Sequence, residues 1–230
     1  MMKILVADDH RLIREGLKPL LARLADTVAI VEAWDAESLV LAVQEHADLD
    51  LALVDLDMPG MQGPATIGRL RTGYPTLPIV VVSGLAERSG IEQLLALGTS
   101  GFIPKSSSID VTLQAIRLVL AGGQYLPPQL LGAMPAAAAS PAAATLPLEA
   151  NQTAGLAASS LSARQQQVLA LLATGLPNKA IARELGVSPG TIKAHLVQIF
   201  RVLGVHNRVS AVIAARNLMK AAAANEHRSA

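Results

Sequence analysis

Acidic side chains follow two short apolar runs of the sequence, in places where they could bind a cation or attack an electrophile. Asp8 and Asp9 follow the first run, and Asp55 follows a later one. Carboxylates that gather in one place raise one another's pKa values, and a hard divalent cation relieves their repulsion. Mg²⁺ accepts one or two carboxylates together with waters and phosphate oxygens. If the fold brings these residues together, we predict a Mg²⁺ site in which Asp55 is free to act as a nucleophile.

A hydroxyl and an ammonium group follow two further apolar runs, at Ser83 and Lys105. Lys105 can pair with a phosphoryl oxygen as a point charge, and Ser83 can hydrogen-bond another oxygen of the same group. Phosphoryl transfer relies mostly on positioning and electrostatics, which these groups would supply together. Taken singly, each residue has a plain structural interpretation, since Asp8 and Asp9 could cap the following helix and Asp55 could open an ordinary turn.

Strands and helices alternate in the part of the chain that must position these residues. Strands are predicted at 3–8, 27–32, 50–55, 78–83 and 101–104, and helices near 10–23, 36–46, 63–73, 88–97 and 108–122. Two of these strands are apolar on both faces, which is typical of strands covered by helices on both sides. The alternation predicts an α/β fold with a doubly wound, five-stranded parallel sheet. Because function in such sheets lies at the carboxyl ends of the strands, we expect the acidic, hydroxyl and ammonium groups to meet in one crevice.

Charge is distributed unevenly along the chain. Residues 1–133 contain 10 Lys/Arg and 15 Asp/Glu, whereas residues 161–230 contain 9 and 2. Between them, residues 134–160 are rich in alanine, proline and serine and are predicted to form a linker, with a poorly amphipathic docked helix as the alternative. A basic module joined to an acidic one favours polyanion binding by the basic part, although chance variation between small domains would give the same pattern.

Several protein classes are excluded by what the sequence lacks. The chain has no cysteine, which excludes disulfides, thiolate zinc sites and cysteine nucleophiles. Its N-terminal apolar run is too short for a signal peptide. No stretch of about 18 apolar residues is present that would span a membrane. We therefore expect a cytoplasmic protein that makes no membrane contact.

Four helices are predicted in the basic part of the chain, so we expect the doubly wound sheet to be followed by a small all-α domain. They are expected to begin after Ser162, near 178, after Ser188 and near 210. In the third helix, apolar residues share one face, at Ile192, Leu196, Ile199 and Leu203. The residues that face the other way are small or polar, namely Lys193, Ala194, Val197, Gln198 and Arg201. Such a helix can enter a DNA major groove, and a helical bundle with a solvated basic face is the alternative.

Two basic residues outside this helix are candidates for phosphate contacts. Lys179 lies at the start of the second helix, and Arg208 lies beyond the third. Contacts of this kind give position and salt dependence but do not select a base sequence.

The first part of the chain resembles the receiver domains of response regulators. The matching motifs are Asp8-Asp9, Asp55-x-x-Met58-Pro59-Gly60, Ser83-Gly84 and Gly101-Phe102-x-x-Lys105, and the resemblance covers residues 1–133. It implies a flavodoxin-like fold, phosphorylation on Asp55, and Mg²⁺ bound by Asp8, Asp9, Asp55 and the backbone carbonyl of Asp57. It also implies that Ser83 is a switch hydroxyl and that Lys105 contacts the phosphoryl group. Phe102 occupies the position of an aromatic ring that turns inward on phosphorylation.

The basic part resembles the LuxR-type helix-turn-helix of NarL/FixJ-family regulators. The matching stretches include Gly175-Leu176-x-Asn178-Lys179, Leu185-Gly186-Val187-Ser188, Gly190-Thr191-Ile192-Lys193-x-His195 and Leu203-Gly204-Val205-x-Asn207-Arg208. The resemblance implies that the third helix reads bases, with Lys179, Thr191, Lys193 and Gln198 at positions that touch DNA, and that the last helix can form a dimer. Gln165 and Gln167 depart from the family, which usually has glutamates there, and the linker looks longer than usual.

Together the two resemblances imply a two-component response regulator. A sensor histidine kinase would phosphorylate Asp55, and phosphorylation would control homodimerisation and binding to a repeat in double-stranded DNA. RNA polymerase is a further candidate partner, and enzyme activity would be limited to self-catalysed phosphotransfer and autodephosphorylation.

Three alternatives remain open at this point. The receiver could be a dimerisation module that needs no phosphate, or the basic bundle could bind a protein as an adaptor. The Asp55-x-Asp57 pair also resembles that of haloacid-dehalogenase-type phosphatases, but the order of the other acidic residues argues against that family.

Overall fold

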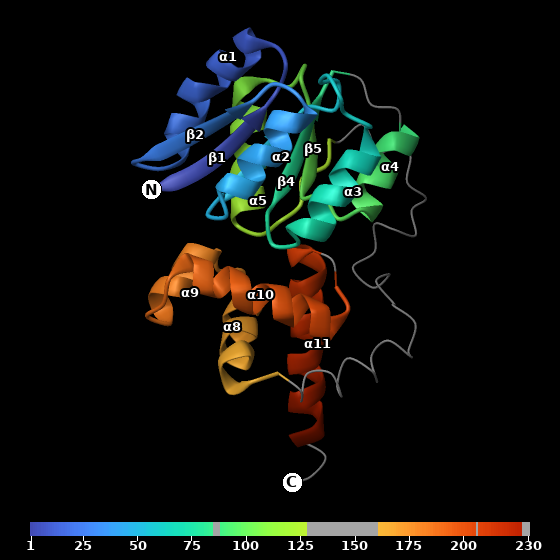
Figure 1. Ribbon diagram of the computed structural model, residues 1–230. Helices are drawn as coiled ribbons and strands as arrows, with labels where there is room; N and C mark the ends of the chain where they lie inside the picture. The colour runs from blue at the N-terminus through green and yellow to red at the C-terminus, as the bar shows by residue number, and fades with distance from the viewer. Residues whose placement is uncertain (85–87, 128–160, 206, 227–230) are drawn as a thin grey trace. The chain divides into compact units, whose positions relative to one another are not determined.

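The computed structural model describes residues 1–84, 88–127, 161–205 and 207–226, and the chain divides into two compact units after Pro127 (Figure 1). The predicted linker at 134–160 lies outside the described residues, so its bounds and those of the two predicted domains stay predictions.

A five-stranded parallel sheet forms the centre of the first unit. Its strands are β1 (Met2–Ala7), β2 (Val28–Ala33), β3 (Leu51–Val54), β4 (Ile79–Ser83) and β5 (Gly101–Pro104). They lie in the order β2-β1-β3-β4-β5, and every neighbouring pair is parallel. Strands β3 and β4 are buried at every position, because their side chains are apolar on both faces. The predicted doubly wound sheet is therefore confirmed.

Helices cover both faces of this sheet. They are α1 (Arg11–Leu21), the short 3₁₀ helix η1 (Ala22–Leu24), α2 (Ala36–Glu45), α3 (Pro64–Gly73), α4 (Arg88–Ala96) and α5 (Ile109–Leu120). Apolar residues of α1 and α5 share one core with β1, β3, β4 and β5. Figure 1 shows α2, α3 and α4 on the opposite face. With both faces covered, the polar ends of the strands are the part of the sheet open to a ligand.

A short segment after α5 extends the edge of the sheet beside β5. Tyr125 forms an isolated parallel bridge with Gly101, in which the Phe102 amide donates to the Tyr125 carbonyl at 3.0 Å and the Tyr125 amide donates to the Ser100 carbonyl at 3.2 Å. A Cβ on Gly101 would lie 2.8 Å from that Tyr125 carbonyl oxygen, so the close approach requires glycine. No strand or bridge was predicted at this position from the sequence.

The second unit consists of four described helices, α8 (Ala163–Ala173), α9 (Asn178–Glu184), α10 (Pro189–Leu203) and α11 (Arg208–Glu226). Ser162 caps α8 as predicted, and Gln165 completes a capping box, since its side chain accepts from the Ser162 amide at 2.8 Å. Ser188 caps α10 through the Thr191 amide. Helix α11 begins at Arg208, close to the predicted start near 210, and ends at Glu226.

The buried face of α10 agrees with the predicted apolar stripe at three of its four positions. Ile192, Leu196 and Ile199 are buried, whereas Leu203 is only partly buried. Phe200 is also buried, because a helix in a globular core buries a face wider than a single row. Among the described residues no single helix is long and apolar enough to cross a membrane; α10 with Arg208–Met219 passes only as a bent pair, by length and composition.

Candidate functional site

An ammonium group joins two buried carboxylates at the carboxyl ends of the strands. Asp8 follows β1, Asp55 follows β3 and Lys105 follows β5, so the parallel arrangement brings all three to one edge of the sheet. The Lys105 Nζ lies 2.7 Å from Asp55 Oδ2 and 2.8 Å from Asp8 Oδ2. The structure therefore assembles three of the predicted site residues.

Burial makes this group of charges interdependent. The side chain of Asp55 is 0% exposed, that of Asp8 is 3% exposed, and that of Lys105 is 20% exposed. Burial by itself would lower the pKa of Lys105, but hydrogen bonds and charge attraction from Asp55 and Asp8 outweigh it and raise that pKa. The ammonium thus stays charged and compensates two carboxylates that have little contact with water.

Donor atoms for a metal ion gather beside this ammonium. One side-chain ligand atom from each of Asp8, Asp9, His10 and Asp55 lies within 4.8 Å of all the others. Carboxylate oxygens are the side-chain ligands that Mg²⁺ prefers, so the three aspartates fit this ion. His10 was not predicted; its Nδ1 lies 2.7 Å from Asp9 Oδ1, and its amide donates to Asp8 Oδ1 at 2.8 Å. Its place directly after the acidic pair was the one sequence signal that pointed to it.

The predicted switch residues lie close to the acidic residues but have partners of their own. The Ser83 hydroxyl is buried and donates to Asp57 Oδ2 at 3.3 Å, and the Asp57 amide donates to Asp55 Oδ1 at 3.3 Å. The Phe102 ring is 3% exposed, so it already lies inside the domain in this structure. An inward turn of this ring on phosphorylation, like the metal role of the Asp57 carbonyl, stays a prediction.

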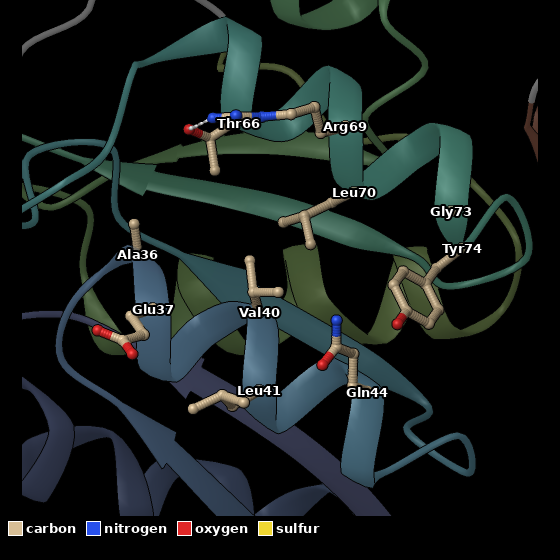
Figure 2. A pocket seen from close by; sticks show the side chains of 10 residues that line it. All are labelled: Ala36, Glu37, Val40, Leu41, Gln44, Thr66, Arg69, Leu70, Gly73 and Tyr74. Carbon is tan, nitrogen blue, oxygen red and sulfur yellow. Dashed lines mark hydrogen bonds between the residues drawn. The ribbon is translucent and has the colours of Figure 1, made fainter.

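A separate groove of about 760 Å³ lies between α2 and α3 (Figure 2). Val40 of α2 points toward Leu70 of α3, and Gln44 lies beside Tyr74. The lining of the groove contains none of Asp8, Asp9, Asp55 and Lys105. The groove is therefore separate from the group of charges at the strand ends.

The outward face of α10 carries the predicted DNA-contacting residues. Thr191, Ala194, Gln198 and Arg201 are exposed, and Lys193 and Val197 are partly exposed. Lys179, in α9, is also partly exposed. The structure therefore leaves one helix face available to a ligand, while the opposite face of the same helix is packed in the core.

Arg208 has a role inside the second unit that the sequence did not reveal. Its guanidinium donates to Asn178 Oδ1 at 2.8 Å and to the Leu176 carbonyl, which joins the start of α11 to the start of α9. Burial lowers the pKa of Arg208 to about 10. The phosphate contact expected of Arg208 stays a prediction, and this internal bonding shows a structural use for the same side chain.

Comparison with known proteins identifies the family. The description "Response regulator receiver domain" matches residues 4–117, and "Bacterial regulatory proteins, luxR family" matches residues 159–215. The "Glycerol metabolism activator" of Pseudomonas putida is 36% identical over 221 residues, which cover 95% of this chain and 96% of the relative. The chain is a LuxR-type response regulator. It has a receiver domain and a LuxR-type DNA-binding domain, as predicted.

Further relatives of this regulator agree in family and fold. The "Nitrate/nitrite response regulator protein NarL" of Escherichia coli is 34% identical over 212 residues, covering 91% of this chain and 93% of the relative. A solved structure of RcsB from Salmonella enterica serovar Typhimurium, bound to a promoter with phosphomimetic BeF3-, has a TM-score of 0.52 and 23% identity, and covers 94% and 98% of the two chains. At that identity the RcsB structure supports the fold of the regulator alone.

Proposed function

We propose that a sensor histidine kinase transfers a phosphoryl group to Asp55. The observation that carries this proposal is the fully buried Asp55 carboxylate held 2.7 Å from the Lys105 ammonium, with Asp8 and Asp9 beside it. In the transfer, an Asp55 oxygen forms a bond to phosphorus while the phosphorus–nitrogen bond to the kinase histidine breaks. Lys105 then donates to an oxygen of the transferred group, which carries negative charge.

Mg²⁺ is the cofactor that this site fits. Asp8, Asp9, Asp55 and the backbone carbonyl of Asp57 would hold the ion, which when bound offsets negative charge on the phosphoryl oxygens. The Ser83 hydroxyl, now donating to Asp57, would turn to donate to a phosphoryl oxygen. Only the hydroxyl would need to turn, because Ser83 already lies at the same end of the sheet as Asp55.

Phosphorylation would shift the regulator toward a state that dimerises and binds repeated half-sites in double-stranded DNA. The exposed residues of α10 would read bases, and nearby basic residues would contact phosphates. The basic composition of residues 161–230 supports the second part of this proposal. A dimer bound in this way could then contact RNA polymerase.

The phosphorylation step is tested with acetyl phosphate and Mg²⁺ on the full chain, with the phosphorylated form separated by gel mobility. Asp55→Asn should abolish the shifted band, because amide nitrogen and oxygen do not replace the nucleophilic carboxylate. Asp110→Asn, at an exposed position on α5, should leave it unchanged. Normal labelling of Asp55→Asn would refute Asp55 as the acceptor.

The DNA step is tested by selecting bound duplexes from a random pool, with Mg²⁺ and with or without beryllofluoride. Enrichment of a repeated motif only with beryllofluoride would support control by Asp55. Equal enrichment in both samples would instead favour a regulator that binds DNA without phosphorylation and uses its receiver for dimerisation.

A further inference from the structure

Arg14 of α1 joins the turn that carries the acidic residues to strand β2. Its Nη1 donates to the backbone carbonyl of Asp8 at 2.7 Å, and its Nε donates to Glu32 Oε2 at 2.9 Å. The Arg14 side chain is 11% exposed, so water competes little for these bonds. Because the guanidinium is planar and rigid, two bonds from it fix the position of the carbonyl relative to Glu32.

The Asp8 carbonyl needs a donor from outside the sheet. The last pair between β1 and β2 is Ala7 with Ala33, and the Asp8 amide still donates to the Ala33 carbonyl at 3.1 Å. If the ladder continued, the Asp35 amide would donate to the Asp8 carbonyl. It donates to Ser38 Oγ at 3.1 Å instead, so the ladder has ended. A buried backbone carbonyl is costly without a partner, and Arg14 provides one.

Glu32 holds Arg14 in place from the other side. Lys18 contributes a second cation to the same carboxylate, with its Nζ 2.7 Å from Glu32 Oε1. Hydrogen bonds from Lys18 and Arg14 lower the pKa of Glu32, so this carboxylate is charged at neutral pH. The bonds described for Lys18 go to Glu32 and Glu15, and neither residue belongs to the acidic site.

We propose that Arg14 is a positioning residue, which holds the Asp8-Asp9 turn in the geometry that binds the metal ion. Glu32 is its anchor, and Lys18 is a neighbour that shares the anchor without reaching the site. The inference rests on the proposed Mg²⁺ site. Groups that orient metal ligands from outside the coordination sphere commonly change metal affinity about 10- to 100-fold when they are removed.

The experiment follows Mg²⁺ binding through the fluorescence of Trp34, the one tryptophan of the chain, which directly follows β2. In the full chain, Arg14→Ala should raise the Mg²⁺ dissociation constant by about 10-fold. Arg14→Lys keeps the charge but loses the planar fork, so it should raise the constant by a smaller factor. Lys18→Ala is the matched control and should leave the constant unchanged, because it removes a cation from Glu32 without touching Asp8.

A second measurement separates positioning from chemistry. With acetyl phosphate as donor, the Mg²⁺ concentration at half-maximal labelling should rise in Arg14→Ala by the same factor as the dissociation constant. The labelling rate at saturating Mg²⁺ should stay close to that of the wild type, because Arg14 contacts none of the reacting atoms. Should Arg14→Ala fail to fold, Glu32→Gln loosens the same anchor without removing the arginine and should raise both Mg²⁺ constants.

The outcomes distinguish this inference from the function on which it rests. If the wild type binds no Mg²⁺, both the proposed site and the role of Arg14 are refuted. If the wild type binds Mg²⁺ and the Arg14 and Glu32 variants bind it equally well, the role of Arg14 alone is refuted. An equal loss in Lys18→Ala would also refute it, because the effect would then belong to the ion pairs around Glu32 in general.

Discussion

The acidic site of the receiver and the outward face of α10 bring their residues together in opposite ways. Asp55 and Lys105 are 50 residues apart in sequence, and Asp8 comes from a third segment of the chain. Thr191 and Arg201, in contrast, lie on one continuous helix. The site in the receiver thus depends on the whole sheet, whereas the α10 face needs only a helix with one side in a core.

The two regions also differ in exposure, and this difference predicts how they respond to mutation. Asp8 and Asp55 are buried charges whose stability depends on Lys105, so removing one partner affects the others. The residues on the α10 face are exposed or partly exposed, so each should act largely by itself. The comparison therefore predicts large, coupled effects in the receiver and smaller, additive effects in the DNA-binding domain.

Loss of the Lys105 ammonium should have the largest effect on stability. Without Mg²⁺, Lys105→Met should lower the free energy of unfolding of the receiver by about 3 kcal/mol, because two buried carboxylates lose their cation. We take the low end of the expected range because Lys105 is 20% exposed. Urea denaturation measures this change. Lys3→Met, which removes a cation from the exposed Asp48, should lower the free energy of unfolding by less than about 1 kcal/mol. An equal loss in the Lys3 and Lys105 variants would contradict the predicted difference between buried and exposed charges.

The same contribution should depend on pH with a definite sign. The pKa of Lys105 is raised in the folded protein above its ordinary value of 10.5. The stability that it contributes is therefore fully present below pH 10.5 and is lost as the pH rises through the raised pKa. The difference in urea midpoint between wild type and Lys105→Met should shrink over that alkaline range. A difference that is constant with pH would show that the charge of Lys105 is not its cause.

A crowded backbone contact at the sheet edge should give the next largest effect. Gly101→Ala places a Cβ 2.8 Å from the Tyr125 carbonyl oxygen and should destabilise the receiver by about 1–3 kcal/mol. Gly90→Ala in α4 is the matched control, because nothing lies within 4 Å of its Cβ position. Thermal unfolding of both variants is the measurement, and an equally stable Gly101→Ala would show that the Tyr125 segment can move away at little cost.

Single changes on the α10 face should weaken DNA binding by smaller amounts that add. Thr191 and Arg201 are ten positions apart, which separates them by about 15 Å along the helix. We expect each alanine variant to lose about 1–3 kcal/mol of binding free energy if it contacts a base, and Arg201→Ala to reduce the salt slope by about 1 if it contacts a phosphate. Binding titrations at several salt concentrations test this. A double variant that departs from the sum by more than about 0.5 kcal/mol would mean that the two residues are coupled.

Removal of a helix cap in the second unit should have the smallest effect on stability. Ser162→Ala should cost about 1 kcal/mol, because the Ser162 side chain accepts from the Gln165 amide at the start of α8. Gln165→Ala removes the reciprocal bond and should cost less. Gln167→Ala serves as the control, since its described bond is an exposed one from Arg164. Chemical unfolding monitored by circular dichroism would detect these changes, and a larger loss for Gln167→Ala would contradict the capping-box interpretation.

Most elements of the fold could be predicted from sequence because burial imposes a period on apolar residues. Strands β3 and β4 are continuous apolar runs, and the inward positions of α10 recur at helical spacing. The Tyr125 extension was missed because two backbone hydrogen bonds hold it to β5, and backbone bonds leave no pattern in side-chain types. Gln165 stands where the family usually has a glutamate, yet it completes a capping box as a glutamate would.

The sequence by itself determined that Asp8, Asp55, Ser83 and Lys105 would lie at strand ends, because apolar runs set the ends and parallel strands share an edge. It also determined which side of α10 faces outward. Only the tertiary structure decided that Lys105 joins two carboxylates and that the Phe102 ring lies inside. The roles of Arg14 and Arg208 in bonding backbone carbonyls were likewise decided by packing, because a carbonyl is present at every residue and its need for a donor appears only once its neighbours are in place.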